Sequence, residues 1–251
     1  MKKQKMAAAG TDTVRVRLDC ARIAQTALGL IDQEGIEQLS MRRIGAALGV
    51  EAMALYHHFR NKAELLDGVK DHLLQRVEAG LTPGAAPLET LRESFCALRQ
   101  IGVDHPDIFP GMGSARYRTE RAMQYYERLF DVFYAAGLNA EQSARYYRLL
   151  SSFTVGTAIA QPPQGARAVA ANAPAVSLTP VAAQTDERMR PIDGAPHVLG
   201  GGRRFPTLRQ ISPFLEGPNM DAIFQFGLDT IFSTLRAELA WCAQSRATTN
   251  A

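Results

Sequence analysis

A tight turn at Leu48-Gly49-Val50 joins two short segments whose apolar residues have helical spacing, and this feature constrains the fold more than any other. Ser40 is suited to cap the first segment, Met41–Leu48, while Gly49 supplies the backbone freedom that a sharp turn needs. The second segment runs over residues 51–57. Four apolar residues have the spacing needed to pack the two segments together: Ile44, Leu48, Val50 and Leu55. The pattern predicts a helix-turn-helix.

Helical spacing also marks the segments around this motif, and no alternating strand pattern appears. Gly35 is expected to end the preceding helix, and Asn61 with Glu64 predicts the start of the following one. The stretch 161–206, rich in Pro, Ala and Gly, predicts a long loop. The remaining helices are expected near 15–34, 88–104, 119–136, 140–160 and 220–241. The sequence therefore predicts an all-α fold with a three-helix head at 15–62, a connecting helix at 63–80 and a larger helical domain at 88–245.

The positive charge of the chain is concentrated near its N-terminus. Residues 1–62 hold ten Lys/Arg and six Asp/Glu, whereas the rest holds eighteen and nineteen. A basic head on a near-neutral body fits binding to a polyanion, although a chance asymmetry of a few charges remains an alternative. Small Ala46 and Ala47 are expected to let the two helices of the motif approach closely, so that the second enters the major groove of double-stranded DNA.

Several other classes of protein are not favoured by the sequence. No run of 18 apolar residues predicts a membrane span, and the basic N-terminus indicates a flexible arm. Cys20, Cys96 and Cys242 are far apart, as expected for reduced core thiols of a cytoplasmic protein without a metal site. No nucleophile elbow, phosphate-binding loop or dinucleotide fingerprint is present, so an enzyme is the disfavoured rival.

Side-chain chemistry suggests how the motif contacts DNA. Ala and Met can touch thymine methyl groups, and His can hydrogen-bond a base edge or a phosphate. Residues 51–57 are expected to read bases and the cationic residues to contact phosphates. The DNA-binding candidates are Arg42, Arg43, Glu51, Ala52, Met53, Ala54, Tyr56, His57 and Lys62.

Each aromatic or basic residue of the motif also has an alternative interpretation. Tyr56 and Phe59 are both compatible with core packing, which is the favoured interpretation for Phe59 only. His57 and His58 form a possible metal pair without a third ligand, so we expect one to face DNA and the other to pack or cap. Arg43 is equally compatible with simple solvation.

Residues 18–77 resemble the head of the tetracycline-repressor (TetR) family. The resemblance is carried by Leu39-Ser40-Met41-Arg42-Arg43-Ile44, by Leu48-Gly49-Val50 and by Leu55-Tyr56-His57-His58-Phe59-Arg60-Asn61-Lys62. It implies phosphate contacts by Arg42 and Lys62 and a backbone contact by Tyr56. It further implies a homodimer that binds a palindromic operator, usually as a repressor, and that a small molecule releases from DNA.

The C-terminal part is similar, more faintly, to the tetracycline repressors themselves, through Ser152-Phe153-Thr154-Val155-Gly156 and residues 224–229. This similarity implies effector binding in the body and dimerisation through helices near 140–160 and 220–241 as a four-helix bundle. The tetracycline–magnesium site of such repressors uses histidines, whereas Glu78 stands in one of those places and 109–111 lack the other. We therefore expect neither tetracycline nor a metal or other cofactor.

An effector cavity is expected among the helices near 88–160. Most of the residues that could line this cavity are also compatible with plain core packing. Arg116, Arg118 and Arg121 either attract an anionic effector or form a solvated helix face. Gly-rich 111–114 and 200–202 lack the strand that a phosphate cradle needs. A DNA-binding architectural protein without an effector is a third alternative, disfavoured by the size of the body. The effector candidates are His105, Phe109, Met112, Arg116, Tyr117, Met123, Tyr126, Phe130 and Phe153.

Overall fold

The computed structural model describes residues 18–114, 118–161, 207, 210 and 220–249. Its regular structure is helical throughout these ranges, which confirms the predicted all-α class. Contacts divide the chain into two units, with the boundary between His72 and Leu73 inside one helix. We call the unit up to His72 the head and the unit from Leu73 onward the body. None of the described helices is long and apolar enough to cross a membrane.

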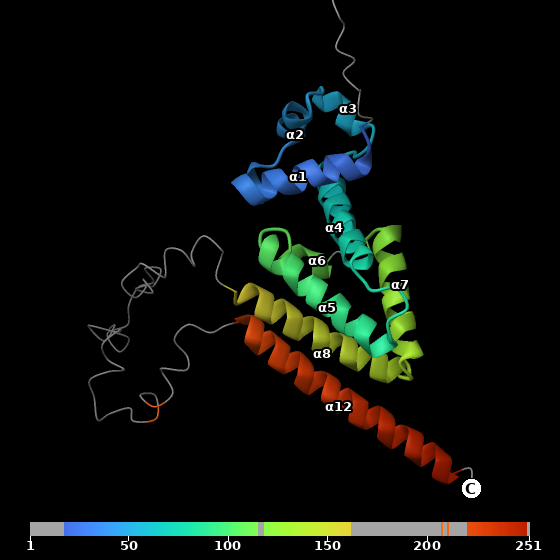
Figure 1. Ribbon diagram of the computed structural model, residues 1–251. Coiled ribbons are helices and arrows are strands. Elements are labelled where there is room, and N and C mark those ends of the chain that lie inside the picture. The colour runs from blue at the N-terminus through green and yellow to red at the C-terminus, as the bar shows by residue number, and fades with distance from the viewer. Residues whose placement is uncertain (1–17, 115–117, 162–206, 208–209, 211–219, 250–251) are drawn as a thin grey trace, which may run out of the picture. The chain divides into compact units, whose positions relative to one another are not determined.

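The head contains α1 (Cys20–Glu34), a 3₁₀ turn η1 (Ile36–Gln38), α2 (Met41–Leu48), α3 (Ala52–Tyr56) and the start of α4 (Lys62–Ala79) (Figure 1). Helix α1 begins later than the spacing predicted because Asp19 caps it, accepting a hydrogen bond from Arg22 N at 2.8 Å. Its apolar stripe is buried against α2 and η1. The head core includes Ile23, Ala27, Ile31, Ile44, Leu55, Phe59, Leu65 and Val69.

Helix α2 comes close to the backbone that leads into α3 at Gly45. A Cβ atom added there would lie 2.8 Å from the Val50 carbonyl oxygen and 3.2 Å from the Ala52 amide nitrogen. Ala46 and Ala47 are exposed instead. The expectation that these two alanines provide the close approach is therefore wrong, because they lie on the solvent side of α2 while Gly45 faces the turn.

The body contains α5 (Pro87–Asp104), α6 (Pro110–Ser114), α7 (Glu120–Ala135), α8 (Ala140–Ile159) and α12 (Met220–Thr249). Helix α5 packs against α7 and α8, and α12 lies along α8 (Figure 1). The short α6 was not expected from the spacing, and α12 continues beyond its expected end near 241. Apart from Gln161, the predicted loop at 161–206 lies outside the described residues.

Two glycines set how closely α8 meets its neighbours. A Cβ atom at Gly102 of α5 would lie 2.7 Å from Ala158 Cβ of α8, so α5 and α8 approach through small residues. On the other side of α8, the Phe153 ring occupies the space where a Cβ of Gly227 on α12 would stand. That ring stacks on Phe224 at a centroid distance of 5.7 Å. The two contacts hold α8 between α5 and α12.

Glu238 stabilises the contact between the N-terminal part of α8 and the C-terminal part of α12. Its carboxylate accepts hydrogen bonds from Tyr146 Oη at 2.7 Å, Gln142 Nε2 at 2.8 Å and Arg145 Nη2 at 2.6 Å. These donors stabilise the ionised carboxylate, the Tyr146 hydroxyl most strongly, and lower the pKa of Glu238. Burial, followed by the contact with Glu238, raises the pKa of Tyr146 to about 12, so the phenol stays protonated at neutral pH.

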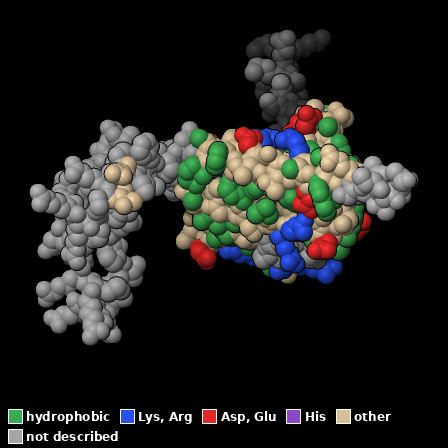
Figure 2. Space-filling view, turned by 90° about the horizontal axis from the view of Figure 1, so that it is seen from below, with side chains coloured by type: hydrophobic (Ala, Val, Ile, Leu, Met, Phe, Trp, Pro, Cys, Tyr) green, Lys and Arg blue, Asp and Glu red, His purple; other side chains and the backbone are tan. Residues whose placement is uncertain are grey.

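Large apolar side chains remain exposed on the outer faces of α8 and α12. Phe226 of α12 is 74% exposed and Ile159 of α8 is 61% exposed, with Leu149, Ile223 and Trp241 exposed as well. Figure 2 shows hydrophobic side chains interspersed with polar ones on the face of the body seen from below. The three cysteines are free, but Cys20 is exposed and the other two are half-buried, so the expectation of core thiols is wrong.

The Gly45→Ala substitution should weaken the packing of α2 against the backbone that leads into α3. Because the new Cβ would overlap the Val50 carbonyl oxygen, we expect the head to lose about 1–3 kcal/mol of stability. Hydrogen exchange measured by mass spectrometry should show faster exchange of α2 and α3 and unchanged exchange of α8.

Gly29→Ala is the matched control, because its Cβ would meet nothing within 4 Å on α1. That change should leave the head unchanged or stabilise it by up to about 1 kcal/mol. Equal exchange in the two variants would contradict the close approach at Gly45.

Candidate nucleic-acid interface and ligand cavity

Local hydrogen bonds build the helix-turn-helix as the sequence predicted. Ser40 caps α2, with its Oγ accepting from Arg43 N at 3.3 Å. Gly49 ends α2 in the left-handed conformation, with φ 69° and ψ 29°, which is why a glycine is needed there. Asn61 Oδ1 accepts from Glu64 N at 2.9 Å, and Glu64 Oε2 accepts from Arg60 N at 2.7 Å. These caps fix both ends of the segment that carries α3.

The short helix α3 presents one face to solvent. Met53 is 67% exposed and Tyr56 is 45% exposed, whereas Leu55 is fully buried and holds α3 on the head core. Glu51 and His57, which flank α3, are exposed, and Ala52 and Ala54 are half-buried. The residues expected to read bases therefore lie together on and beside α3. The face mixes methyl-bearing and hydrogen-bonding groups, which suits contact with base edges.

The basic residues expected to contact DNA differ in the interactions that their side chains already make within the protein. Arg42 is exposed at the start of α2. The Arg43 guanidinium forms an ion pair with Glu34 of α1. Lys62 is half-buried, and its Nζ donates to the Ile36 carbonyl oxygen at 2.9 Å. A lysine ammonium has three donors, so this bond leaves capacity for an external anion.

The structure separates the aromatic and histidine alternatives of this segment. Phe59 is 6% exposed, and its ring fills the space beside Gly68, which assigns it to the core. His57 is exposed, whereas His58 is half-buried with Nδ1 3.7 Å from Cys20 Sγ. Among the described residues, no group of three His, Cys, Asp or Glu is arranged to hold a metal ion.

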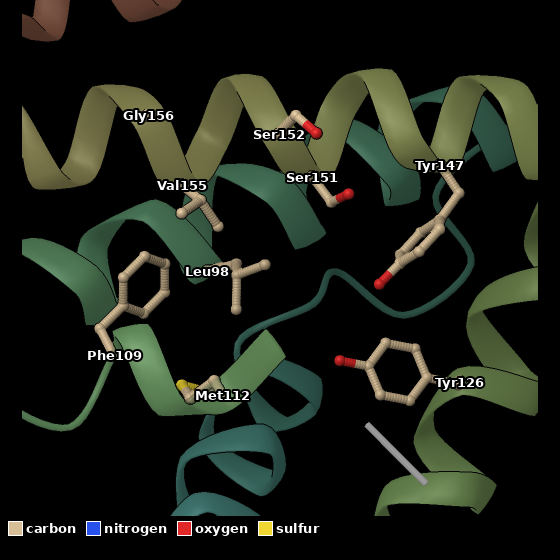
Figure 3. Close-up of a pocket in the computed structure, with 9 residues that line it drawn as sticks. All are labelled: Leu98, Phe109, Met112, Tyr126, Tyr147, Ser151, Ser152, Val155 and Gly156. Atoms are coloured by element: carbon tan, nitrogen blue, oxygen red, sulfur yellow. The ribbon is translucent and has the colours of Figure 1, made fainter. Parts of the chain in front are cut away.

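A cavity of about 400 Å³ lies in the body between α5, α6, α7 and α8. In Figure 3 the rings of Tyr126 and Tyr147 extend into one side, while Phe109, Leu98 and Met112 line the other. The Tyr126 and Tyr147 rings meet edge to face with centroids 6.0 Å apart. Helix α8 completes the wall with Ser151, Ser152, Val155 and Gly156.

The lining gives the cavity an amphipathic character. Most of the wall is aromatic or aliphatic, and the polar groups that point into the cavity are the hydroxyls of the two tyrosines and of Ser151. The Ser151 hydroxyl donates within its own helix to the Arg148 carbonyl oxygen at 3.2 Å, which leaves its oxygen able to accept. None of the described residues that line the cavity is charged. Such a wall suits a ring system that carries a few hydrogen-bonding oxygens.

Three of the effector candidates, Phe109, Met112 and Tyr126, line this cavity. His105 lies nearby at the end of α5, where its Nε2 is 3.0 Å from Arg76 Nη1 of α4. Phe130 packs against Tyr147 behind the wall, at a centroid distance of 5.2 Å.

The other effector candidates lie elsewhere. Met123 is 49% exposed, and Phe153 stacks on Phe224 toward α12. Arg116 and Tyr117 are outside the described residues.

Sequence reasoning did not include the part of the wall that α8 supplies. Tyr147, Ser151 and Val155 recur every four residues and so lie on one face of that helix. This periodicity was visible in the sequence. It did not distinguish a cavity wall from ordinary core, because both produce the same spacing.

Comparison with known proteins gives matches to both units. Residues 23–69 match the family model described as bacterial regulatory proteins, tetR family. Residues 87–239 match the model described as tetracyclin repressor-like, C-terminal domain. The second match alone spans more than half of the chain.

Individual proteins give the same result. The HTH-type transcriptional repressor DrrR1 of Streptomyces coeruleorubidus is 28% identical over 87% of this chain and 77% of its own length. The tetracycline repressor protein class C of Escherichia coli is 31% identical over 58% of this chain and 67% of its own.

The crystal structure of the TetR family protein ActR of Streptomyces coelicolor in complex with actinorhodin is also similar. It has 27% identity and a TM-score of 0.62, and the match covers 89% of this chain and 97% of that one. With a helix-turn-helix head and a tetracyclin repressor-like body both matched, the chain belongs to the TetR family of bacterial regulatory proteins.

Proposed function

We propose that this ligand-responsive regulator is a homodimeric repressor that binds a palindromic operator in the cytoplasm. A small aromatic molecule in the cavity between α5 and α8 releases it from DNA. The observation that carries the proposal is the amphipathic cavity of about 400 Å³ in a body joined to a DNA-binding head. An architectural DNA-binding protein would have no use for such a cavity.

The exposed face of α3 supports the reading of bases. Met53 and the flanking Glu51 and His57 project from the head, and Arg42 stands exposed at the start of α2 for a phosphate. Tyr56 is exposed enough to donate its hydroxyl to the DNA backbone. We assign Arg43, Ala52 and Ala54 to the rim of the same surface.

The exposed apolar side chains of α8 and α12 support the proposed dimer. Phe226 and Ile223 of α12 and Leu149 and Ile159 of α8 form apolar outer faces on two helices that already pack together. A second copy would bury these side chains in a four-helix arrangement related by a two-fold axis. The two heads would then meet successive major grooves about 34 Å apart.

The cavity wall favours a planar ligand with hydroxyl or carbonyl oxygens. ActR, a relative with 27% identity, has been solved in complex with actinorhodin. Tyr126 and Tyr147 offer aromatic faces and hydroxyls to such a molecule. Tetracycline with magnesium is not proposed, because the Glu78 carboxylate is paired with Arg121 and Arg128.

A chain of contacts connects the cavity to α4, which runs from Lys62 in the head to Ala79 in the body. Arg76 of α4 contacts His105, and the His105 carbonyl oxygen accepts from Phe109 N at 3.1 Å. Phe109 lines the cavity. A ligand that displaces Phe109 would pull on His105 and so on α4. It weakens DNA binding only if it prefers the geometry that does not fit DNA.

Lys62→Met should weaken binding to every DNA sequence alike. If its ammonium contacts one phosphate, the slope of log affinity against log salt should fall by about one unit in the variant. Fluorescence anisotropy with a duplex from the protein's own upstream region, titrated at several salt concentrations, measures both quantities. Because Lys62 also bonds Ile36, the melting temperature of the variant must be recorded beside them.

Met53→Gln is the matched comparison in the same head. It should change which base pairs are preferred and leave the salt slope unchanged, because a methionine releases no counterion. An unchanged affinity and slope for Lys62→Met, with folding intact, would remove Lys62 from the phosphate contacts.

Ser151→Trp should make the repressor insensitive to its effector. The indole would fill the cavity from α8, while the head would remain as it is. Thermal-shift screening of aromatic, antibiotic-like compounds would identify a ligand, and anisotropy would then measure its effect on DNA affinity. We expect the compound to weaken DNA binding of the parent protein and to leave Ser151→Trp bound. Release of both proteins to the same degree would place the effector elsewhere.

A further inference from the structure

An ion pair between Arg43 and Glu34 joins the first turn of α2 to the last turn of α1. Arg43 Nη2 contacts Glu34 Oε2, and the two side chains are 46% and 31% exposed. Of the other two cationic DNA-binding candidates, Arg42 is exposed, and Lys62 bonds the neutral carbonyl group of Ile36. Arg43 differs from Lys62 because a carboxylate balances its charge within the head.

The partners of Arg43 and Lys62 belong to one short stretch of chain, the connection between α1 and α2. Glu34 and Ile36 are two residues apart, so their Cα atoms are separated by about 7 Å at most. Two cationic side chains, one from α2 and one from α4, are therefore held at the same connection. This places Arg43 on the part of the head where Lys62 is expected to meet the DNA backbone.

The Glu34 carboxylate and a DNA phosphate are alternative partners for the Arg43 guanidinium. Both are oxyanions that accept paired, charge-assisted hydrogen bonds from an arginine. An exposed ion pair is weak, because water and salt screen it, whereas duplex DNA carries a dense row of phosphates. DNA can therefore displace Glu34 from Arg43. The displaced carboxylate then leaves an unbalanced negative charge near the DNA, which opposes binding.

We propose that Glu34 competes with the DNA backbone for Arg43 and so limits the affinity of the head for DNA of any sequence. This inference rests on the proposed phosphate contacts and deepens them. Phosphate contacts carry no sequence information, so the competition lowers the affinity for operator and for other DNA alike. It also lowers the salt dependence, because the displaced carboxylate attracts a cation while Arg43 releases one from the DNA. Glu34 acts only through Arg43.

Glu34→Gln tests the competition, because it removes the negative charge and keeps an amide oxygen that can accept from Arg43. Fluorescence anisotropy of the full-length protein is measured with a mixed-sequence duplex at several salt concentrations. We expect binding to tighten by about tenfold at low salt and the salt slope to steepen by roughly one unit for each bound head. Loss of structure would not produce tighter binding.

Arg43→Gln tests whether Glu34 acts through Arg43, and Glu37→Gln is the matched control for the lost charge, because Glu37 is exposed in η1. Glu37→Gln should tighten binding less than Glu34→Gln does. In the Arg43→Gln background, adding Glu34→Gln should change the affinity no more than Glu37→Gln does in the parent, since no guanidinium remains to compete for. An equal gain from Glu34→Gln in both backgrounds, or from Glu37→Gln, would overturn the proposal.

Circular dichroism melts establish that each variant is folded, and Glu34→Gln should hardly change the melting temperature, because an exposed pair contributes little to stability. Weaker DNA binding by Glu34→Gln would mean that the carboxylate positions Arg43 for DNA, which contradicts competition. Unchanged binding would also overturn this inference and leave the proposed repressor standing. A parent protein that binds neither this duplex nor its own upstream region would overturn both.

Discussion

The body depends on one geometric constraint, which is that α8 must serve several partners at once. At roughly 100° per residue, its successive side chains point in different directions. Ala158 meets α5 where Gly102 has no side chain, and Phe153 fills the space that Gly227 leaves on α12. Tyr147, Ser151 and Val155 line the cavity. Other side chains of α8, including Leu149 and Ile159, are exposed and available to a second copy. One helix therefore joins ligand binding to the proposed dimer contact.

The head has its own constraint at Gly45, where α2 approaches the turn before α3. This contact, together with the buried Leu55, fixes which side of α3 faces outward. Met53 and Tyr56 are exposed as a consequence. Helix α4 begins in the head and ends in the body, so it is the covalent route between DNA and ligand. In the body, α4 is held at Arg76 by His105 and at Glu78 by two arginines. The His105 carbonyl oxygen accepts from the backbone N–H of Phe109, which lines the cavity between α5 and α8.

Local signals made the helices and caps predictable from sequence. Ser40, Gly49 and Asn61 act through atoms a few residues away, and the structure has each of them as expected. The role of Gly45 was not predicted, because it depends on the backbone of Val50 and Ala52, which follow the turn after α2. The charge of Lys62 was visible, but its bond to the Ile36 carbonyl oxygen joins residues 26 apart in sequence. Phe153 was grouped with the effector residues because nothing local reveals that it stacks on Phe224.

In the proposed mechanism, a ligand in the body changes the spacing of the two heads of a dimer. Cys20 is exposed on α1 and can carry a spin label after Cys96 and Cys242 are replaced by alanine. Pulsed electron paramagnetic resonance then measures the distance between the two labels of a dimer. We expect one narrow distance distribution on operator DNA and a distribution with a different mean when ligand saturates the protein. Identical distances, with a ligand that nevertheless releases the DNA, would contradict this mechanism.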